Sequence, residues 1–425
     1  MSNGFLNAQT YSNVMLLLLK NQLVMGRLVD GRHKNEVTDE NGLTTSIKRP
    51  PQFLANNGPT LQPQDVLAGS AQVAVDQYKG VHISISDLEM VQSYNALMQS
   101  ETMKSAASTL AQTIDAYLAD KTLEFSATAF GGAAATFDPI NSAAQFNAVH
   151  TELMENAVPN SDLNAVVTFK DGELIRGGLL SGNIDDVNRT ALQRVRIPIL
   201  SEIDLYATQN APVYTAGTHA MSAGPQVDGA TEIVNYRDVK TTMTQTISLK
   251  GLGAAATGKR GEVFTIAGVF KWDWRNQRAL PSLRRFVVMA DFTADGAGLA
   301  EVSISPPIIV QGTNDGVSTT ANSAFGTVSA TPADSAALTF DSAASTSYQV
   351  RTAFHKRAIA LVSAKLVKPM TGESSFSTDP ETGISIRYWR GSDIATGAHI
   401  HRWDTIFGAT NVDRRLGARI WGDNP

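Results

Sequence analysis

The sequence contains no cysteine among its 425 residues. Disulfides, thiolate metal sites and cysteine nucleophiles are therefore excluded, and the composition is typical of a protein made in a reducing cytoplasm. An excess of basic residues is also missing. The net charge is −5, with both signs interspersed, which argues against a polybasic nucleic-acid-binding surface. The apolar run from Val14 to Leu19 is too short to cross a bilayer and lacks a basic start, so we expect neither a membrane span nor a signal peptide.

Convincing catalytic motifs are missing as well. Gly253 to Lys259 has the spacing of a phosphate-binding loop, but Arg260 stands where a Ser or Thr is needed and strand-like residues replace the helix. His399 and His401 alternate on one strand face, whereas Asp404 has the opposite parity and nothing completes a metal site. We therefore expect no catalytic residue, no cofactor and no metal ion.

What the chain does contain is enough residues for two or three domains and an ordinary hydrophobic content of 43%. Residues 86–125 carry a long helical pattern, which Ser86 and Glu89 begin as a capping box. No glycine or proline occurs from there to Phe125. The apolar residues recur at spacings of three and four: Met103, Ala107, Leu110, Ile114 and Tyr117. One helix of this span would be roughly 50–60 Å long; the alternative is two helices with a break near Ser100.

Residues 1–34 have the character of an arm. Tyr11 to Val29 is predicted as a helix that Asp30-Gly31 ends. Its predicted apolar face consists of Val14, Leu17, Leu18, Leu23 and Met25. This face either docks on its own domain or reaches a neighbouring subunit. If it serves a neighbour, removing the residues before Gly31 should leave a folded subunit that assembles poorly.

The next segment, residues 35–85, is dense in turn signals and predicts short extended pieces. Its strand-like residues alternate: Val73, Val75, Val81, Ile83 and Ile85. We interpret it as a two-stranded excursion that needs a partner surface. Residues 126–211 mix a helix (Asn141 to Asn156) with a buried strand (Ala165 to Phe169, ended by Lys170-Asp171-Gly172) and an edge strand (Arg196 to Leu200).

From 212 to 340 the pattern changes to short alternating runs separated by turns, without convincing helices. This indicates a small all-β barrel or sandwich, inserted into a mixed α/β chain. The predicted strands are Met243–Leu249, Val263–Ala267, Phe286–Ala290, Glu301–Ile304 and Ile308–Val310. Residues 341–425 then predict a helix from Ala353 to Lys365. Three strands follow it: Ile384–Trp389, Ile400–Phe407 and Ala418–Trp421.

An aromatic and basic group in this β region allows two interpretations. Trp272 and Trp274, with Arg275 and Arg278, have the composition of a patch for single-stranded nucleic acid. Within a β domain they are more typical of residues that pack or meet a partner chain. The predicted segments are a long helix, an N-terminal arm, a two-stranded extension and an inserted barrel. Each is better suited to contacting a neighbouring subunit than to forming a ligand pocket. The residues alone thus favour a self-assembling structural protein.

The second half of the chain also resembles the major coat proteins of the phage P22 family. The similar stretches occur in order: Gly258–Val269, Leu283–Gly296, Ile304–Ile308, Ala353–Leu361, Gly383–Trp389 and Arg402–Gly408. The resemblance implies an α+β capsid fold of the HK97 type with an inserted all-β barrel. Residues 1–34 would be the arm and 35–85 the extended loop. Residues 86–211 would form the spine helix, the peripheral domain and the first part of the axial domain. Residues 212–340 would be the inserted barrel, and 341–425 the rest of the axial domain with the return strands of the peripheral domain.

The function that this resemblance implies is that of a major capsid protein. Homo-pentamers and homo-hexamers would tile an icosahedral virion shell, assembled in the host bacterial cytoplasm with a scaffolding protein and a portal. The shell would enclose the double-stranded DNA of a tailed phage without sequence-specific binding and without a membrane. The alternatives are a phage tail or decoration protein, or a ligand-binding β-domain protein. The candidate subunit-interface residues are Leu17, Leu18, Met25, Arg284, Arg285, Trp272 and Trp274; we expect the two arginines to open a strand.

Overall fold

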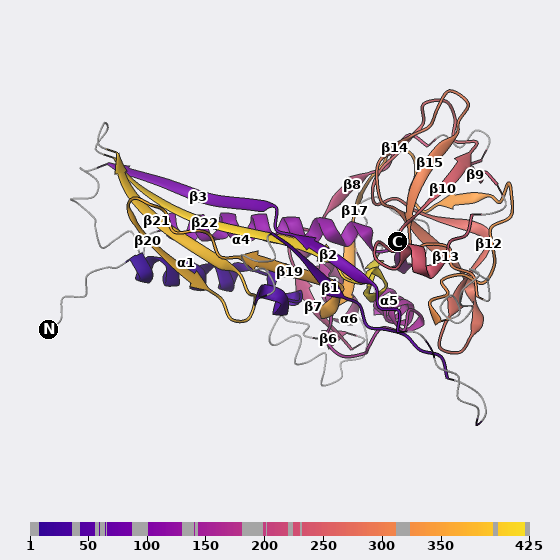
Figure 1. Cartoon of the computed structure of the whole chain (residues 1–425), viewed down its shortest axis with the longest axis horizontal. Coiled ribbons are helices and arrows are strands. Elements are labelled where there is room, and N and C mark those ends of the chain that lie inside the picture. Colours follow the sequence, from indigo (N-terminus) through magenta and orange to yellow (C-terminus); the bar gives the residue numbers. More distant parts are fainter. Residues whose placement is uncertain are drawn as a thin grey trace. The chain divides into compact units, whose positions relative to one another are not determined.

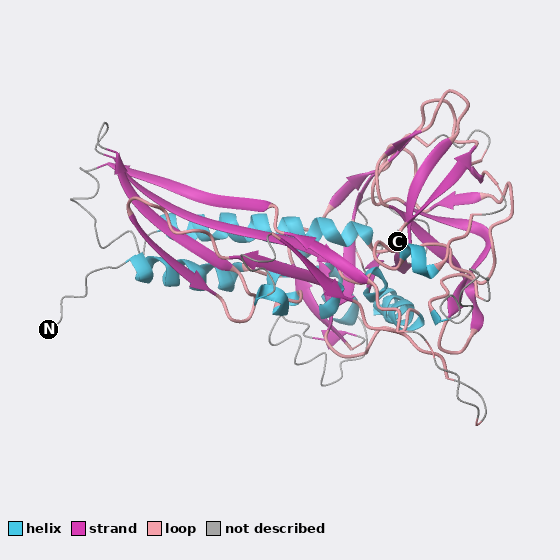
Figure 2. Cartoon of the chain, viewed as in Figure 1, coloured by secondary structure: helices cyan, strands magenta, loops and turns pink. Residues whose placement is uncertain are grey.

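The computed structural model describes residues 8–35, 43–55, 59, 64, 66–86, 101–129, 140, 143–180, 199–200, 202–219, 224–229, 232–311, 324–393 and 398–420. The chain divides into two compact units. The first consists of residues 1–47, 72–121 and 359–412. The second consists of residues 48–71, 122–358 and 413–425. Each unit combines helices with strands (Figures 1 and 2).

The first unit is organised around an antiparallel five-stranded sheet (Figure 1). Its strands are β3 (Gln77–Ser86), β19 (Ile359–Ala364), β20 (Glu373–Thr378), β21 (Ser385–Asp393) and β22 (Ala398–Asn411). The long strand β22 pairs with β3 along its length, from Phe407 opposite Gln77 to Ala398 opposite Ser86. On its other side β22 pairs with β21 and then with β19. Because side chains alternate along each strand, the sheet has two faces of different character.

Helices α1 (Ala8–Gln22), α2 (Met25–Leu28) and α4 (Glu101–Lys121) pack in the same unit (Figure 1). Helix α1 contacts α4 and strands β20 and β21. The Tyr11 ring stacks on that of Tyr388, with centroids 5.2 Å apart, and Trp403 is buried on this face. The predicted stripe of α4 is confirmed for Met103, Ala107, Leu110 and Ile114, which are all buried, while Tyr117 is half-buried.

A short strand pair precedes β3. Strand β1 (Thr44–Lys48) pairs with β2 (Ser70–Ala74) as a two-stranded sheet. The predicted strand residues Val81, Ile83 and Ile85 lie in β3, which pairs with β22 and not within this segment. Ile47, Val73 and Val75 are buried in one cluster with Ala360 and Val362. The pair thus gains the apolar support that an isolated hairpin lacks.

The second unit contains a mixed sheet with the order β4-β23-β18-β5-β7-β6. These strands are β4 (Ala127–Ala129), β5 (Leu163–Val167), β6 (Ile199–Leu200), β7 (Ile203–Ala207), β18 (Arg351–His355) and β23 (Gly417–Ile420). Helices α5 (Ala143–Glu155) and α6 (Phe169–Leu180) belong to the same unit, and Phe146, Val149 and Leu153 of α5 share a core with β5. The edge position of β6 agrees with the edge strand predicted near Pro198.

The inserted strands form an antiparallel sheet with the order β16-β12-β13-β15-β10-β9. They are β9 (Gln226–Val227), β10 (Gln245–Lys250), β12 (Val263–Asp273), β13 (Arg278–Val288), β15 (Ala300–Ser305) and β16 (Leu338–Phe340). A bridge from Gln226 to Ala337 links the two outermost strands, so the sheet curls into a nearly closed barrel. Phe264, Phe286 and Ile304 lie in its core. The smaller pairs are β8 (Val213–Thr215) with β17 (Ser347–Gln349), and β11 (Thr257–Gly258) with β14 (Phe292–Thr293); the short helix α8 (Tyr236–Val239) lies between β9 and β10 along the chain.

Several local predictions were wrong. The helix expected from Ala353 to Lys365 is two strands, β18 and β19, joined by a 3₁₀ turn at Lys356–Ala358. Nearly every residue of these strands is buried, and a run that is apolar on both faces has no period that separates strand from helix. Lys170-Asp171-Gly172 lies inside α6 and does not form a turn. At Ile308–Val310 only an isolated bridge forms.

The helical arm also differs from its prediction. Helix α1 ends at Gln22, and α2 follows as a separate turn. The buried face is Tyr11, Met15 and Leu19, and not the face that contains Val14 and Leu17. The expected helix start at Ser86 and the alternative break near Ser100 lie outside the described residues, which resume with α4 at Glu101.

Candidate assembly surfaces

The first helix presents one exposed apolar side chain among its predicted interface residues. Leu17 is 60% exposed, whereas Leu18 is half-buried. Met25, in α2, is buried inside its own unit, so it has no free surface to offer a neighbour. Because Tyr11, Met15 and Leu19 belong to the core, deleting the residues before Gly31 would remove core side chains. We therefore expect this truncation to destabilise the subunit itself, and not to leave a folded subunit that only fails to assemble.

A buried carboxylate on α4 fixes the connection between α1 and α2. The Asp115 carboxylate accepts from the backbone N–H of Val24 at 2.8 Å and of Gly26 at 3.0 Å. Burial raises the pKa of Asp115 to about 6, although these backbone bonds act in the opposite direction. Asp115 is only 2% exposed. Its partners, about ninety residues away in sequence, explain its burial.

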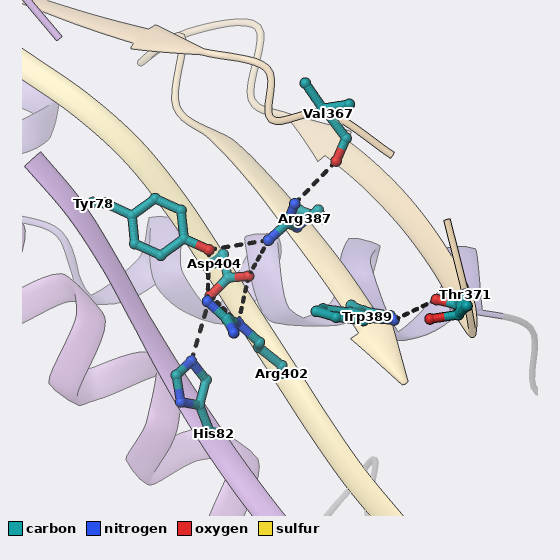
Figure 3. A network of polar contacts seen from close by, with 8 residues as sticks. All are labelled: Tyr78, His82, Val367, Thr371, Arg387, Trp389, Arg402 and Asp404. Atoms are coloured by element: carbon teal, nitrogen blue, oxygen red, sulfur yellow. Dashed lines mark hydrogen bonds and ion pairs between the residues drawn. The ribbon is translucent and has the colours of Figure 1, made fainter. Parts of the chain in front are cut away.

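A second buried carboxylate, Asp404, lies on the face of the large sheet opposite Tyr388 and Trp403 (Figure 3). Arg402 Nε donates to both carboxylate oxygens at 2.7 Å, and Arg387 Nη2 donates to Oδ2 at 2.7 Å. The Tyr78 hydroxyl accepts from both guanidinium groups. Burial by itself would raise the pKa of Asp404, but the bonds from Arg402 and Arg387 outweigh it and keep the pKa below its ordinary value.

Strand β3 accommodates this carboxylate by means of a glycine. A Cβ atom placed on Gly80 would lie 2.3 Å from Asp404 Oδ1 and 3.0 Å from the carbonyl oxygen of Trp403. Gly80 is the residue directly opposite Asp404 in the β3–β22 register. The missing side chain is thus a steric requirement of the Asp404 cluster.

The same cluster holds a loop. Residues 365–372 connect β19 to β20, and two of their carbonyls accept side-chain bonds from β21. Arg387 Nη1 donates to Val367 O and Trp389 Nε1 donates to Thr371 O, both at 2.9 Å (Figure 3). Val367 and Met370 are nevertheless 82% and 105% exposed.

In the second unit, a charged cluster joins the barrel to helix α5. Lys271, on β12, is only 2% exposed. Its ammonium group donates to Glu152 Oε2 at 2.6 Å and to Glu155 Oε2 at 3.0 Å. Both carboxylates are on α5, so a lysine with two acids links elements that are more than a hundred residues apart.

The two arginines predicted at an interface do not open a strand but lie well inside β13. Arg284 is buried and donates to Asn156 Oδ1 at 3.1 Å; burial lowers its pKa to about 10. Arg285 donates to Asp341 Oδ2 at 3.1 Å. Both side chains therefore have partners within their own unit.

The two tryptophans are half-buried at the end of β12. Arg275 lies over the Trp274 ring at 5.5 Å from its centroid and also donates to Ala157 O. Trp272 pairs in register with Ala279 on β13. The two tryptophans thus lie close together, and both remain partly exposed.

The two histidines considered for a metal site, His399 and His401, lie on the opposite sheet face from Asp404, as their parity predicted. His401 is buried beside Tyr388, whose hydroxyl lies 2.7 Å from Nδ1, while Asp404 lies on the other face. Within the described ranges, no group of three or more His, Asp or Glu residues has the arrangement of a metal site. None of the described helices is long and apolar enough to cross a membrane.

These features belong to a protein of mixed α+β architecture in which buried charged clusters connect strands and helices. The chain belongs to the P22 coat protein family (gene protein 5), whose model matches residues 8–422. It is therefore a shell-forming coat protein of a tailed phage and not an enzyme. Membership also confirms the α+β, HK97-type capsid fold with an inserted barrel that the resemblance implied.

Solved structures with similar folds include other phage capsids. A Mycobacterium phage Che8 structure is 13% identical and covers 94% of this chain and 90% of its own, with a TM-score of 0.45. The capsid of Ralstonia phage GP4 is 7% identical, covers 96% and 91%, and also has a TM-score of 0.45. The CUS-3 coat protein I-domain is 24% identical over 28% of this chain and 97% of its own, with a TM-score of 0.21. No curated protein sequence matches. We base the assignment on the family match.

Proposed function

We propose that this coat protein builds its shell from homo-pentamers and homo-hexamers, with a scaffolding protein and a portal as assembly partners. The observation that carries the proposal is the family match over residues 8–422, which includes all the described elements. In this proposal, residues 1–34 act as the arm, 35–85 as the extended loop and 212–340 as the inserted domain. The double-stranded genome is enclosed without sequence-specific contacts.

The charge of the chain is consistent with that role. A strongly basic inner wall would bind DNA through counterion release and hinder packing and ejection, whereas this chain has a net charge of −5. Leu17 is the arm residue that we propose for a contact between subunits, because it is the one predicted arm position with a largely exposed apolar side chain. Many modest contacts of this kind would give a closed shell its stability through multivalency.

Electron microscopy and light scattering of the purified chain test the proposal. The chain is expressed alone and together with a candidate scaffolding protein. We expect uniform closed shells with the scaffolding protein, and sheets, spirals or irregular shells without it. A stable monomer or small oligomer under every condition would contradict the proposal and favour a tail or decoration protein.

A further inference from the structure

Two exposed apolar side chains lie close together on the loop between β19 and β20. Val367 is 82% exposed and Met370 is 105% exposed. Scattered apolar residues on a surface need no explanation. These two differ because they lie three positions apart on one short loop, and because that loop is fastened to the sheet beneath it.

The fastening is specific. Arg387 donates to Val367 O and Trp389 donates to Thr371 O. Arg387 is itself held by the buried carboxylate of Asp404. At the end of the loop Gly372 has φ +80°, and a Cβ there would lie 2.5 Å from Arg390 O and 2.7 Å from Trp389 Nε1. Only a glycine fits this close approach.

A loop fixed in this way loses little conformational entropy when a partner covers it, so more of the gain from burying Val367 and Met370 remains as binding free energy. The bonds to its carbonyls leave both apolar side chains facing outward. We propose that residues 365–372 form a pre-organised contact surface for a second copy of this chain. The proposal rests on the self-association of a coat protein and deepens it by naming the surface.

Chemistry favours another copy of the chain as the occupant. The exposed Lys365 and Lys368 lie on the same loop, one before Val367 and one directly after it, and Arg387 and Arg402 outnumber Asp404 beneath the loop. The chain as a whole has 40 acidic and 35 basic residues. A basic-rimmed apolar loop therefore complements the average surface of a second copy. DNA would match the positive rim but would gain nothing from burying Val367 and Met370.

The absence of cysteine makes a direct test simple. Met370→Cys introduces the sole thiol of the chain at a fully exposed position, where substitution should leave stability within about 0.5 kcal/mol of wild type. Maleimide labelling is compared in free subunits, in closed shells and in shells dissociated with denaturant. We expect labelling in shells to be at least about tenfold slower than in free subunits, and to recover on dissociation.

The outcomes separate the occupants. Equal labelling in shells and free subunits overturns the proposal while leaving shell formation itself intact. Protection that disappears from shells once the scaffolding protein has left assigns the loop to that protein and also overturns the proposal. Protection that persists in empty shells without DNA or scaffolding protein supports a second copy. Failure of the wild-type chain to form shells would instead contradict the function proposed above.

Substitutions test whether the contact matters. Val367→Asp with Met370→Asp should lower shell yield about tenfold or more, because two charges would be buried without partners. The melting temperature of the free subunit should stay unchanged. The matched control, Val367→Ile with Met370→Leu, keeps the apolar surface and should assemble normally. Normal assembly of the double aspartate variant overturns the proposal.

Proteolysis tests whether the hydrogen bond from Trp389 to Thr371 O holds the loop in place. Trp389→Phe keeps an aromatic ring but removes the donor to Thr371 O. Trypsin should then cleave after Lys365 a few times faster in the free subunit, because the loop opens more often. Shell yield should fall less than in the double aspartate variant. Unchanged cleavage together with unchanged assembly would show that pre-organisation plays no part.

Discussion

Each of the two units contains a buried charge cluster, and the clusters have opposite composition. In the first unit one carboxylate, Asp404, accepts from two guanidinium groups. In the second unit one ammonium group, that of Lys271, donates to two carboxylates. The Asp404 cluster also binds a loop carbonyl and thereby shapes an exposed surface. The Lys271 cluster binds only within the unit and attaches a barrel strand to a helix. Similar electrostatics thus serve assembly in one unit and internal cohesion in the other.

The largest effect should come from removing the single charge at the centre of the Lys271 cluster. Lys271→Ala removes the ammonium group that is hydrogen-bonded to Glu152 and Glu155, which should cost about 3–5 kcal/mol in the free energy of unfolding measured with urea. Lys271→Met combined with Glu152→Leu should recover most of this loss. The exposed pair of Lys250 with Asp334 supplies the control, since water and salt screen that pair and Lys250→Ala should change the free energy of unfolding far less. A Lys271→Ala protein as stable as wild type would contradict the central role of the lysine.

The corresponding change in the first unit should cost less. Asp404→Ala leaves Arg387 and Arg402 without their shared carboxylate. Because these side chains are 12% and 29% exposed, they keep some hydration, and we expect the free energy of unfolding to fall by about 2–3 kcal/mol. Gly80→Ala should destabilise the wild type because its Cβ would meet Asp404 Oδ1. In the Asp404→Ala background the same change should cost less. Strictly additive effects in this double-mutant cycle would contradict the steric argument.

A third buried acid, Glu262 in the second unit, has no comparable cation. It accepts from the backbone N–H of Gly217, and burial raises its pKa to about 7. The folded state therefore holds this proton more tightly than the unfolded chain does, so stability should fall as pH rises from about 4.5 to 7. Relative to Glu262→Gln, the wild type should lose roughly 2–3 kcal/mol across that range. His219 Nε2 lies 3.7 Å from Glu262 Oε1, and burial lowers the pKa of His219. This histidine makes stability rise with pH, and it does so in the wild type and in Glu262→Gln alike. Parallel pH profiles of wild type and variant would contradict the prediction.

The smallest effect on folding lies outside both clusters. Leu17→Ala removes an exposed side chain and should change the free energy of unfolding by less than about 0.5 kcal/mol. Its matched control, Leu19→Ala, removes a buried neighbour on the same helix and should cost about 2–4 kcal/mol. If Leu17 contacts another subunit, Leu17→Ala should lower shell yield although the subunit remains stable. Normal shell yield would remove the arm contact from the proposal.

Local sequence patterns predicted most helices and strands with one buried face. The features that they did not predict depend on residues that are distant in sequence. The stripe on α4 and the alternation in β21 and β22 arise from one face meeting a core, which a short window records. Strands β18 and β19 are buried on both faces, so their apolar run lacks a readable period. The positions of Asp115, Asp404 and Lys271 were not predictable, because a charged residue is normally exposed and each has partners elsewhere in the chain. The loop at Val367 was not predicted either, because the side chains that hold it, Arg387 and Trp389, are about twenty residues away in sequence.

The position of β23 bears on the timing of synthesis. Residues 417–420 pair with β18 on one side and with β4 on the other, so a strand near the end of the sequence occupies the interior of the sheet. A nascent chain cannot complete this sheet on the ribosome until residue 420 has left the exit tunnel. Products of premature termination would expose the unpaired edges of β4 and β18, which are templates for aggregation and targets for proteolysis. Completion of this sheet therefore depends on residues 417–420.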